Sequence, residues 1–441
     1  MYMLRVIILF LLSFSFISCN DPYDSETGIL KDALGQVIDK VDLVNKTDID
    51  GGSFIFITDT HGTSNTWNSP QQIKYILQNT PIDKVIWGGD AISAYGDNIE
   101  QQWEWHCDAF DAIIKGYGKL YKVRGNHDFT IRASENSDEG RTLSQHQTFQ
   151  YLFKDAPAGI VKNAEDPDGC YYYFDDDKSK IRYIIIDTDD SVSEGNVPWG
   201  VWNGVHDVQL DWIANTAIAS TPKNYSIVFV SHIPITDTTT QFYPTFSNLL
   251  MLVNAVNTRS SGRIRTVNYD FSSLDNVRVL LYLSGHQHHD MQTYQNGVLH
   301  VVTACDTAYS DYLSDPFVVD KSGRYGANAQ CFDGVCIDKN KENISFIRFG
   351  VGGNRFFHLQ PVRLKVGEEA LLNISQKGDA FTWHSYNSSG NSYANWVWTL
   401  SNTIVVVNGQ GVVSGIVPGE AVVLNMNERG DKEFYNVIVE K

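Results

Sequence analysis

Five short clusters of polar residues along the chain carry side chains that bind metal ions in proteins. These side chains are carboxylates, an amide and imidazoles, which offer oxygen and nitrogen ligands without thiolate and therefore suit Zn²⁺, Mn²⁺ or Fe. The clusters are Asp59-Thr60-His61, Gly88-Gly89-Asp90, Gly125-Asn126-His127-Asp128, Ser231-His232 and Gly285-His286-Gln287-His288. Together these residue types indicate a site for two metal ions.

The spacing within the clusters favours a shared site. In Asp59-x-His61 and His286-x-His288 the i, i+2 spacing puts both side chains on one side of an extended segment. A glycine precedes Asp90, Asn126 and His286, and glycine lets the backbone turn sharply and come close to bound ions.

Two metal ions roughly 3.5–4 Å apart can clamp a phosphate group and lower the pKa of a bridging water toward about 7. The hydroxide that bridges the ions would then attack phosphorus in line. The chain carries 34 Lys and Arg residues against 52 Asp and Glu residues, a formal net charge of −18. Because acidic surfaces repel nucleic-acid backbones, we expect no nucleic-acid-binding surface, and two bound cations would supply the positive centre that a phosphate ester needs.

The clusters must be positioned by the elements that precede them. Apolar, β-rich runs predict buried strands at residues 53–58, 84–87, 120–123, 181–187, 226–231, 277–284 and 298–303. Helical spacing of apolar residues predicts helices at 71–78 and 101–114. The polar clusters follow strand ends, and the carboxyl ends of strands in an open α/β sheet meet in one crevice. We therefore expect an α/β fold with a mixed sheet or two packed sheets that gathers the five clusters.

The ordered series D-x-H, G-D, G-N-H-D, H and G-H-x-H resembles the calcineurin-like metallophosphoesterase superfamily over about residues 50–350. The resemblance implies an α/β (α+β) fold, a four-layer β-sandwich flanked by helices. It also implies two divalent ions, Mn, Zn or Fe. The implied ligands are Asp59, His61 and His288 for one ion, Asn126, His232 and His286 for the other, and Asp90 as the bridge. His127 would protonate the leaving oxygen or bind the phosphate, with Asp128 orienting its ring.

Two positions depart from the common family pattern. The segment Gly89-Asp90-Ala91-Ile92-Ser93 lacks the tyrosine that ligates iron in purple acid phosphatases, which disfavours that subgroup. Arg124 stands before Gly125, where many bacterial members have proline. Phosphoprotein phosphatases have an arginine there that touches the substrate phosphate, so Arg124 is a candidate substrate-binding residue. A structural salt bridge is the alternative reading of Arg124.

The N-terminus resembles the signal of a bacterial lipoprotein. Arg5 precedes an apolar run from Val6 to Ser18, which is shorter than the roughly 20 residues that span a bilayer. Phe16-Ile17-Ser18-Cys19 resembles a lipobox, so residues 1–19 are expected to be a signal peptide and Cys19 the lipidated anchor. This predicts an exported, membrane-anchored protein on an outer-membrane, periplasmic or surface face. An ordinary cleaved signal is the alternative.

The sequence changes character near Gly350. Gly350-Val351-Gly352-Gly353-Asn354 is typical of a linker, and residues 357–441 show short β-branched runs separated by turn signals. This part resembles a bacterial Ig-like domain of group 2, which implies a small all-β sandwich that acts as a spacer or adhesive module. Cys331 and Cys336 are close enough in sequence to form a disulfide across a tight loop.

We therefore expect a hydrolase that cleaves phosphate monoesters or diesters of small-molecule or lipid substrates. The alternative is a catalytically silent surface protein that binds or adheres through its Ig-like domain. The presence of His127 beside a complete ligand set favours the enzyme, since a binding protein has no need of a proton donor. The leaving group and the oligomeric state stay open.

Overall fold

The structure is a computed structural model of the 441-residue chain. It describes residues 31–47, 52–62, 65–93, 98–132, 140–190, 204–236, 245–306, 330–375, 380–387 and 403–441. The signal peptide expected at residues 1–19, including Cys19, lies outside these ranges. In the described ranges, no helix has both the length and the apolar character needed to cross a membrane.

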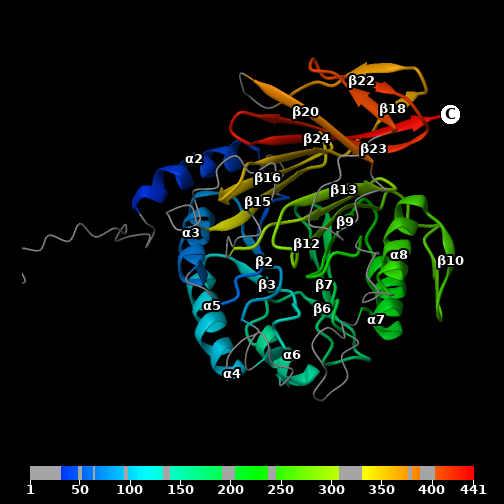
Figure 1. Ribbon diagram of the computed structural model, residues 1–441. Helices are drawn as coiled ribbons and strands as arrows, with labels where there is room; N and C mark the ends of the chain where they lie inside the picture. The colour runs from blue at the N-terminus through cyan, green and yellow to red at the C-terminus, as the bar shows by residue number, and fades with distance from the viewer. Residues whose placement is uncertain are drawn as a thin grey trace, which may run out of the picture.

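Two large sheets lie face to face at the centre of the molecule (Figure 1). Among the described residues, the first runs in the order β20 (Phe381–Asn387), β23 (Gly419–Asn427), β24 (Lys432–Glu440), β17 (Arg355–His358), β16 (Asn343–Gly350), β15 (Cys331–Asp338), β1 (Phe54–Ile57), β2 (Lys84–Trp87) and β3 (Lys119–Lys122). The second runs in the order β13 (Met291–Gln295), β14 (Val298–Val302), β12 (Arg278–Ser284), β9 (Ser226–Val230), β8 (Ile181–Ile185), β7 (Tyr172–Asp176) and β6 (Val161–Lys162).

Helices cover the outer faces of both sheets (Figure 1). The first sheet is covered by α2 (Lys31–Thr47), α3 (Asn65–Asn79) and α5 (Asp108–Ile114), with α4 (Ile99–Gln102) and the π-helical turn η1 (Trp103–Cys107) leading into α5. The second is covered by α7 (Asp207–Trp212), the π-helical turn η2 (Ile213–Ile218) and α8 (Phe246–Thr258). Helix α6 (Gln145–Phe153) begins with a capping box at Ser144 and Gln147.

The main core lies between the two sheets. Strand β1 shows how the layers form: Phe54 and Phe56 pack toward the second sheet, while Ile55 and Ile57 pack toward the helices. A strand buried on both faces reads as an unbroken apolar run, which is what residues 54–57 present. The arrangement helix, sheet, sheet, helix confirms the expected four-layer sandwich.

Parallel pairing in both sheets brings the strand ends together. Strands β1, β2 and β3 pair in parallel, and in the second sheet β8, β9, β12 and β14 pair in parallel. Their carboxyl ends therefore lie at one edge of each sheet, which is where ligands bind in such folds. Two short hairpins, β4 (Thr130–Arg132) with β5 (Gly140–Thr142) and β10 (Ser261–Ile264) with β11 (Val267–Asp270), lie outside this pattern.

The C-terminal strands continue the first sheet. The segment Gly350–Asn354, which the sequence suggests is a linker, instead forms the turn between the antiparallel strands β16 and β17. The other edge of β17 pairs in parallel with β24, and Figure 1 shows the red strand β24 near the yellow strands β15 and β16. Residues Tyr386, Val422, Leu424 and Phe434 also belong to the core between the two large sheets.

A smaller sheet completes the C-terminal region. Strand β18 (Val362–Lys365) pairs with β24, and β19 (Glu369–Leu371), β22 (Val412–Gly415) and β21 (Val405–Val407) form a separate three-stranded sheet among the described residues. Residues 357–441 are therefore β-rich, as expected, and their assignment to the Ig-like family stays a prediction.

The disulfide considered for Cys331 and Cys336 does not form. Both are thiols on one continuous strand, β15. Their side chains point to opposite faces, because an odd separation of five residues reverses the direction in a strand. No loop brings the two sulfur atoms together.

Candidate metal centre

The five polar clusters meet where the carboxyl ends of β1, β2, β3, β9 and β12 converge. Backbone hydrogen bonds join the loops that carry them. The amide of Asp59 donates to Gly89 O at 3.0 Å, and the amide of His61 donates to Asp90 O at 3.0 Å. Across the other sheet, the amide of Gly285 donates to His232 O at 3.0 Å. Hydrogen bonds therefore join the Asp59 loop to the Asp90 loop, and the His232 segment to the Gly285 loop.

Several of the candidate ligands have left-handed backbone conformations. Asp59, His61, Asp90, His286 and His288 all have φ between 47° and 71°. Few residues other than glycine adopt such angles, and they cluster at functional sites where the surrounding structure holds them. These backbone conformations direct the side chains that follow the strand ends toward a common centre.

Two glycines are required by close packing at this centre. A Cβ on Gly125 would lie 2.2 Å from Asp90 Oδ1, and a Cβ on Gly285 would lie 2.5 Å from Asp59 Oδ2. Both distances are far below van der Waals contact. These glycines precede Asn126 and His286, as the sequence pattern anticipates.

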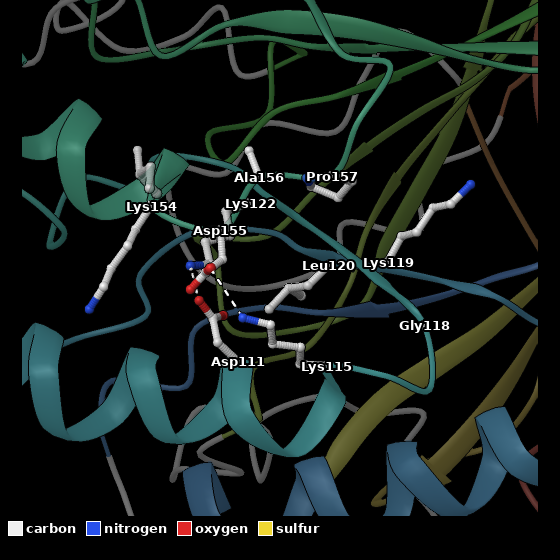
Figure 2. A pocket seen from close by; sticks show the side chains of 11 residues that line it. Asp111, Lys115, Gly118, Lys119, Leu120, Lys122, Lys154, Asp155, Ala156 and Pro157 are labelled. Atoms are coloured by element: carbon white, nitrogen blue, oxygen red, sulfur yellow. Dashed lines mark hydrogen bonds and ion pairs between the residues drawn. The ribbon is translucent and has the colours of Figure 1, made fainter.

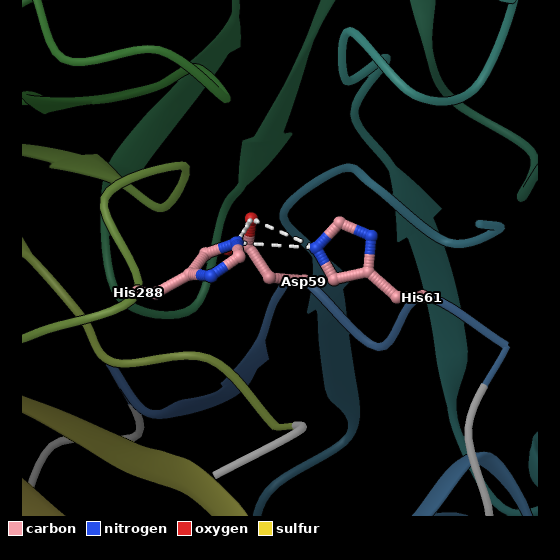
Figure 3. Close-up of side chains that lie close together, drawn as sticks. All are labelled: Asp59, His61 and His288. Atoms are coloured by element: carbon pink, nitrogen blue, oxygen red, sulfur yellow. Dashed lines mark hydrogen bonds and ion pairs between the residues drawn. The ribbon is translucent and has the colours of Figure 1, made fainter. Parts of the chain in front are cut away.

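The first ligand group consists of Asp59, His61 and His288 (Figure 3). The Nε2 atoms of His61 and His288 lie 3.1 Å apart, and Asp59 Oδ1 lies 3.4 Å from His288 Nε2 and 3.9 Å from His61 Nε2. Figure 3 shows the two rings pointing toward the carboxylate from opposite sides.

The second group surrounds His232. Asp90, His232 and His286 form a second cluster of possible ligands, and Asn126 Oδ1 lies 3.0 Å from His232 Nε2. Asp90 Oδ2 lies 3.2 Å from His232 Nε2, 3.8 Å from His127 Nε2 and 3.9 Å from His61 Nε2. Asp90 therefore lies between the two groups, where the family resemblance expects the bridging ligand.

The residues present fit divalent metal ions. Asp59 is completely buried, yet its Oδ1 accepts no hydrogen bond while imidazole nitrogens surround it. A buried carboxylate oxygen needs a partner, and a cation shared with His61 and His288 would supply one. Burial raises the pKa of Asp90, but His232 and His127 outweigh it and hold that pKa well below its usual range, so the ligand carboxylate is ionised.

Neighbouring groups fix the orientation of these ligands. Asp59 Oδ2 accepts hydrogen bonds from Thr58 Oγ1 at 2.7 Å and from the amide of His286 at 3.0 Å. His232 Nδ1 lies 2.9 Å from Gly88 O, which directs Nε2 toward the centre. Such outer contacts set ring orientation and ligand basicity at metal sites. Thr58 is not among the site residues predicted from the sequence, although its position directly before Asp59 is a signal that could have revealed its role.

His127 lies on the more exposed side of the centre. Its amide donates to Asp90 Oδ1 at 2.8 Å, its ring packs edge-on against His61 at 4.7 Å, and its side chain is 17% exposed. Burial lowers the pKa of its imidazole, a shift that Asp90 opposes. The ring is therefore close to both ligand groups and within reach of a substrate from solvent.

Asp128 has partners other than those expected. The resemblance implies that it orients the ring of His127. In the structure its Oδ2 accepts from the amides of Gly125 at 2.7 Å and Asp90 at 3.0 Å, and its Oδ1 accepts from the amide of Ala91 at 2.7 Å. The carboxylate therefore ties the Asp90 loop to the Asn126 loop.

Arg124 forms a buried salt bridge, and its candidate role in substrate binding stays a prediction. Its side chain is 3% exposed, its Nε donates to Asp187 Oδ1 at 3.0 Å, and its Nη2 lies 2.9 Å from Asp187 Oδ2. The same Nη2 donates to the backbone oxygen of Asp189. This salt bridge agrees with the structural alternative that the sequence left open. Asp187 is the last residue of the strand predicted at 181–187, and the five polar clusters likewise lie at strand ends.

A cavity of about 360 Å³ lies away from this centre (Figure 2). Lys119 lines it at the start of β3, whereas Asn126 and His127 follow the end of that strand. Two of its lysines pair with aspartates: Lys122 Nζ lies 2.7 Å from Asp111 Oδ2, and Lys115 Nζ lies 3.4 Å from Asp155 Oδ1. Figure 2 shows these pairs facing each other inside the cavity. Lys115 and Lys122 therefore already have carboxylate partners in this cavity.

The fold and the Asp/His centre together define the class of metal-dependent hydrolases. Residues 52–290 match the family described as calcineurin-like phosphoesterase, and the chain belongs to that family. This is a family of metal-dependent phosphoester hydrolases, which confirms the family resemblance. No curated protein matches the chain in sequence.

Several solved structures are similar to parts of the chain at low identity. GAP50, the anchor in the inner membrane complex of Plasmodium, is 13% identical with a TM-score of 0.36, covering 67% of this chain and 82% of that chain. Phosphopantetheinyl hydrolase from Mycobacterium tuberculosis is 14% identical with a TM-score of 0.29, covering 57% and 89%. A putative 5′-nucleotidase from Staphylococcus aureus is 11% identical with a TM-score of 0.35, covering 69% and 53%. At these values the likeness carries no functional inference.

Proposed function

We propose that this protein cleaves phosphate monoesters or diesters with two divalent ions, Mn, Zn or Fe. The observation that carries the proposal is the position of Asp90 Oδ2, within 3.9 Å of the Nε2 atoms of His232, His127 and His61. One carboxylate oxygen between two ligand groups is the arrangement that two adjacent ions require.

Each ion would have its own ligands. Asp59, His61 and His288 would hold one, Asn126, His232 and His286 the other, and Asp90 would contact both. The bound ions would neutralise phosphate charge and acidify water. The protein's part is to orient these ligands through buried contacts such as that of His232 Nδ1 with Gly88 O at 2.9 Å.

His127 would serve the substrate. Its partly exposed ring lies beside Asp90, where it can hold a phosphate oxygen or donate a proton to the leaving oxygen. Burial lowers the pKa of this imidazole, and a bound phosphate dianion would raise it again. Substrate binding would therefore favour the protonated form that a general acid needs.

The substrate is proposed to be a small-molecule or lipid phosphoester. The formal net charge of −18 disfavours a long polyanion, since only the metal centre would offset the repulsion. A short substrate can place its one phosphate at that centre without meeting the acidic surface.

The sequence pattern ending at Cys19 supports a further part of the proposal, that the protein is exported and anchored by lipid. In cells, the protein should sediment with membranes, and Cys19→Ala should move it to the soluble or secreted fraction. Soluble full-length protein with an unmodified cysteine would contradict the anchor.

The proposed activity is tested with bis-p-nitrophenyl phosphate and p-nitrophenyl phosphate. Protein stripped with EDTA should be inactive, and Mn²⁺ or Zn²⁺ should restore hydrolysis of at least one ester; the preferred ester distinguishes diesterase from monoesterase. Asp90→Asn should abolish recovery because it removes the shared carboxylate. Protein that binds two ions yet hydrolyses no ester in a broad phosphoester screen would contradict the proposal and leave the silent binding protein as the function.

A further inference from the structure

A cluster of four buried charged side chains includes Asp290, which follows the loop that carries His286 and His288. Two are arginines, Arg348 on β16 and Arg355 on β17, and two are aspartates, Asp290 and Asp333. All four side chains are at most 5% exposed. We call this set the buried quartet.

Each aspartate in the buried quartet contacts both arginines. Asp290 Oδ1 lies 2.7 Å from Arg348 Nη2 and 3.0 Å from Arg355 Nη1. Asp333 Oδ1 accepts from Arg348 Nε at 2.9 Å, and Asp333 Oδ2 accepts from Arg355 Nη2 at 2.8 Å. The formal charges of these four side chains sum to zero, and Lys432 adds a further favourable charge beside Asp290.

Stability alone does not explain this arrangement. Removing charges from water is costly, and apolar residues of similar volume often stabilise a protein as well or better. The surrounding strands supply an apolar core that could have filled the same space. An ionic network of this kind favours one backbone geometry, because a movement of the backbone would separate the charges from their partners.

The loop from Gly285 to His288 is the part of the backbone whose conformation most needs to be stabilised. His286 and His288 are both left-handed, with φ of 71° and 59°. At its start, the loop is held by the bond from Gly285 N to His232 O at 3.0 Å and by that from His286 N to Asp59 Oδ2 at 3.0 Å. Asp290 lies just beyond the other end of the loop, two residues after His288.

Asp290 is the anchor at the far end of the loop. Besides the two arginines, its Oδ1 accepts the amide of Ala304 at 3.1 Å. His288 is itself 25% exposed and contacts the first ligand group, through Asp59 at 3.4 Å and His61 at 3.1 Å. An anchor next to it limits how far its ring can move from that group.

The C-terminal strands contact the backbone segment that carries Arg348 and Arg355. Arg355 pairs with Lys432 in the register of β17 and β24. Asn354 accepts the amide of Lys432 at 2.8 Å and donates its own amide to Asp431 Oδ1 at 2.8 Å. Its side-chain oxygen also accepts the amide of Arg348 at 3.0 Å.

We propose that Asp290 is a positioning residue for the metal centre, and that the C-terminal strands act on the centre through Arg348 and Arg355. The proposal rests on the proposed function in one respect, that the centre binds metal. It adds residues outside the ligand set to the metal-binding machinery.

The test compares Asp290→Asn with Asp333→Asn. Both remove one carboxylate charge from the same arginine pair, but only Asp290 is attached to the metal loop. We expect Asp290→Asn to weaken Mn²⁺ binding about 10-fold or more, as loss of outer contacts at metal sites does, while Asp333→Asn loses thermal stability with a much smaller change in affinity. Calorimetric titration of EDTA-stripped protein with Mn²⁺ measures affinity, and thermal denaturation of the same metal-free samples measures stability.

If the buried quartet only stabilises the fold, we expect a different result. Both variants would then lose stability and keep the wild-type affinity for Mn²⁺, or both would lose affinity for Mn²⁺ by the same factor. Either outcome overturns the proposal. If Asp290→Asn does not fold, Arg355→Lys keeps the charge, removes one of the two guanidinium partners, and should still weaken Mn²⁺ binding several-fold; native affinity in that variant overturns the proposal too. Since the titration requires no turnover, wild-type protein that binds Mn²⁺ without hydrolysing esters would contradict the proposed function only.

Discussion

His127 is the predicted general acid, and its role does not require contact with a metal ion. It lies 3.8 Å from Asp90 through Nε2 and 17% of its side chain is exposed. We expect His127→Ala to keep its bound metal and to lower kcat by about 10²–10⁴-fold, the range that a positioned general acid contributes. Steady-state kinetics and elemental analysis of the same preparation measure both quantities.

The matched control for this prediction is His146→Ala. His146 is exposed and pairs with Asp168 at 2.8 Å on the surface, so its loss should change neither kcat nor metal content. If His127→Ala loses metal together with turnover, then His127 is a ligand and the proton donor is another group.

His232 makes metal binding dependent on pH. Burial lowers its pKa, but Asp90 and Asp59 outweigh burial and raise that pKa to about 10 in the metal-free protein, whereas burial lowers the pKa of His61 to about 4 and that of His286 to about 3. The raised pKa means that the imidazolium and its pairing with the aspartates persist at neutral pH and are lost only as pH rises through about 10. Because a metal ligand must be neutral imidazole, the metal must displace this proton.

Metal binding near pH 7 should therefore release about one proton, and the affinity should rise about tenfold per pH unit between pH 6 and 8. Titration calorimetry in two buffers of different ionisation enthalpy counts the proton. Binding with no proton released would show that His232 is already neutral, and the pairing with Asp90 and Asp59 would then be weaker than the geometry indicates.

The identity and order of the ligands could be predicted from the sequence, but the roles of two neighbouring residues could not. Asp59, Asp90 and His232 lie together because strand ends converge, and strand ends can be recognised locally. The partners of Arg124 and Asp128 lie elsewhere: Arg124 pairs with Asp187, and Asp128 accepts amides of the Asp90 loop. Such pairings depend on how loops distant in sequence approach each other.

Among the secondary-structure elements, helix α2 is the clearest omission from the sequence predictions. The strand predicted at 84–87 coincides with β2, because an apolar run bounded by polar residues marks a buried strand. In residues 34–47 of α2, whose burial is described, the buried residues are Val37, Val41 and Val44, at positions i, i+4 and i+7 within a mainly polar segment. One narrow apolar stripe is a weak signal until a sheet is present to cover it.

We expect Val44→Ala to destabilise the protein by about 2 kcal/mol, since Val44 is fully buried against the first sheet and loses two buried carbon groups. Ile38→Ala on the same helix is the control: Ile38 is 41% exposed, and its loss should cost less than about 0.5 kcal/mol. Urea denaturation of both variants measures the difference. Equal effects would mean that α2 does not pack as the structure shows.

At the scale of the whole molecule, the sequence places a boundary where the structure has a continuous sheet. Glycines near Gly350 and the change from helices to strands suggest a linker, because a tight turn and a linker have similar composition. The pairing of β17 with β24 could not be foreseen, since it joins residues nearly eighty positions apart. Parallel pairing of this kind leaves no local pattern in the sequence.

A protein ending at residue 350 tests how the two regions depend on each other. Truncation removes Arg355, opens the edge of β16, and exposes the face of the core that Tyr386, Leu424 and Phe434 cover. An open apolar edge strand promotes aggregation, and Asp290 would lose one of its two arginines. We expect the truncated protein to be insoluble, or soluble with a lower melting temperature and weaker Mn²⁺ binding than the full chain. A soluble fragment with native affinity would instead show that the catalytic region folds alone, and that the C-terminal strands are the spacer that their sequence resembles.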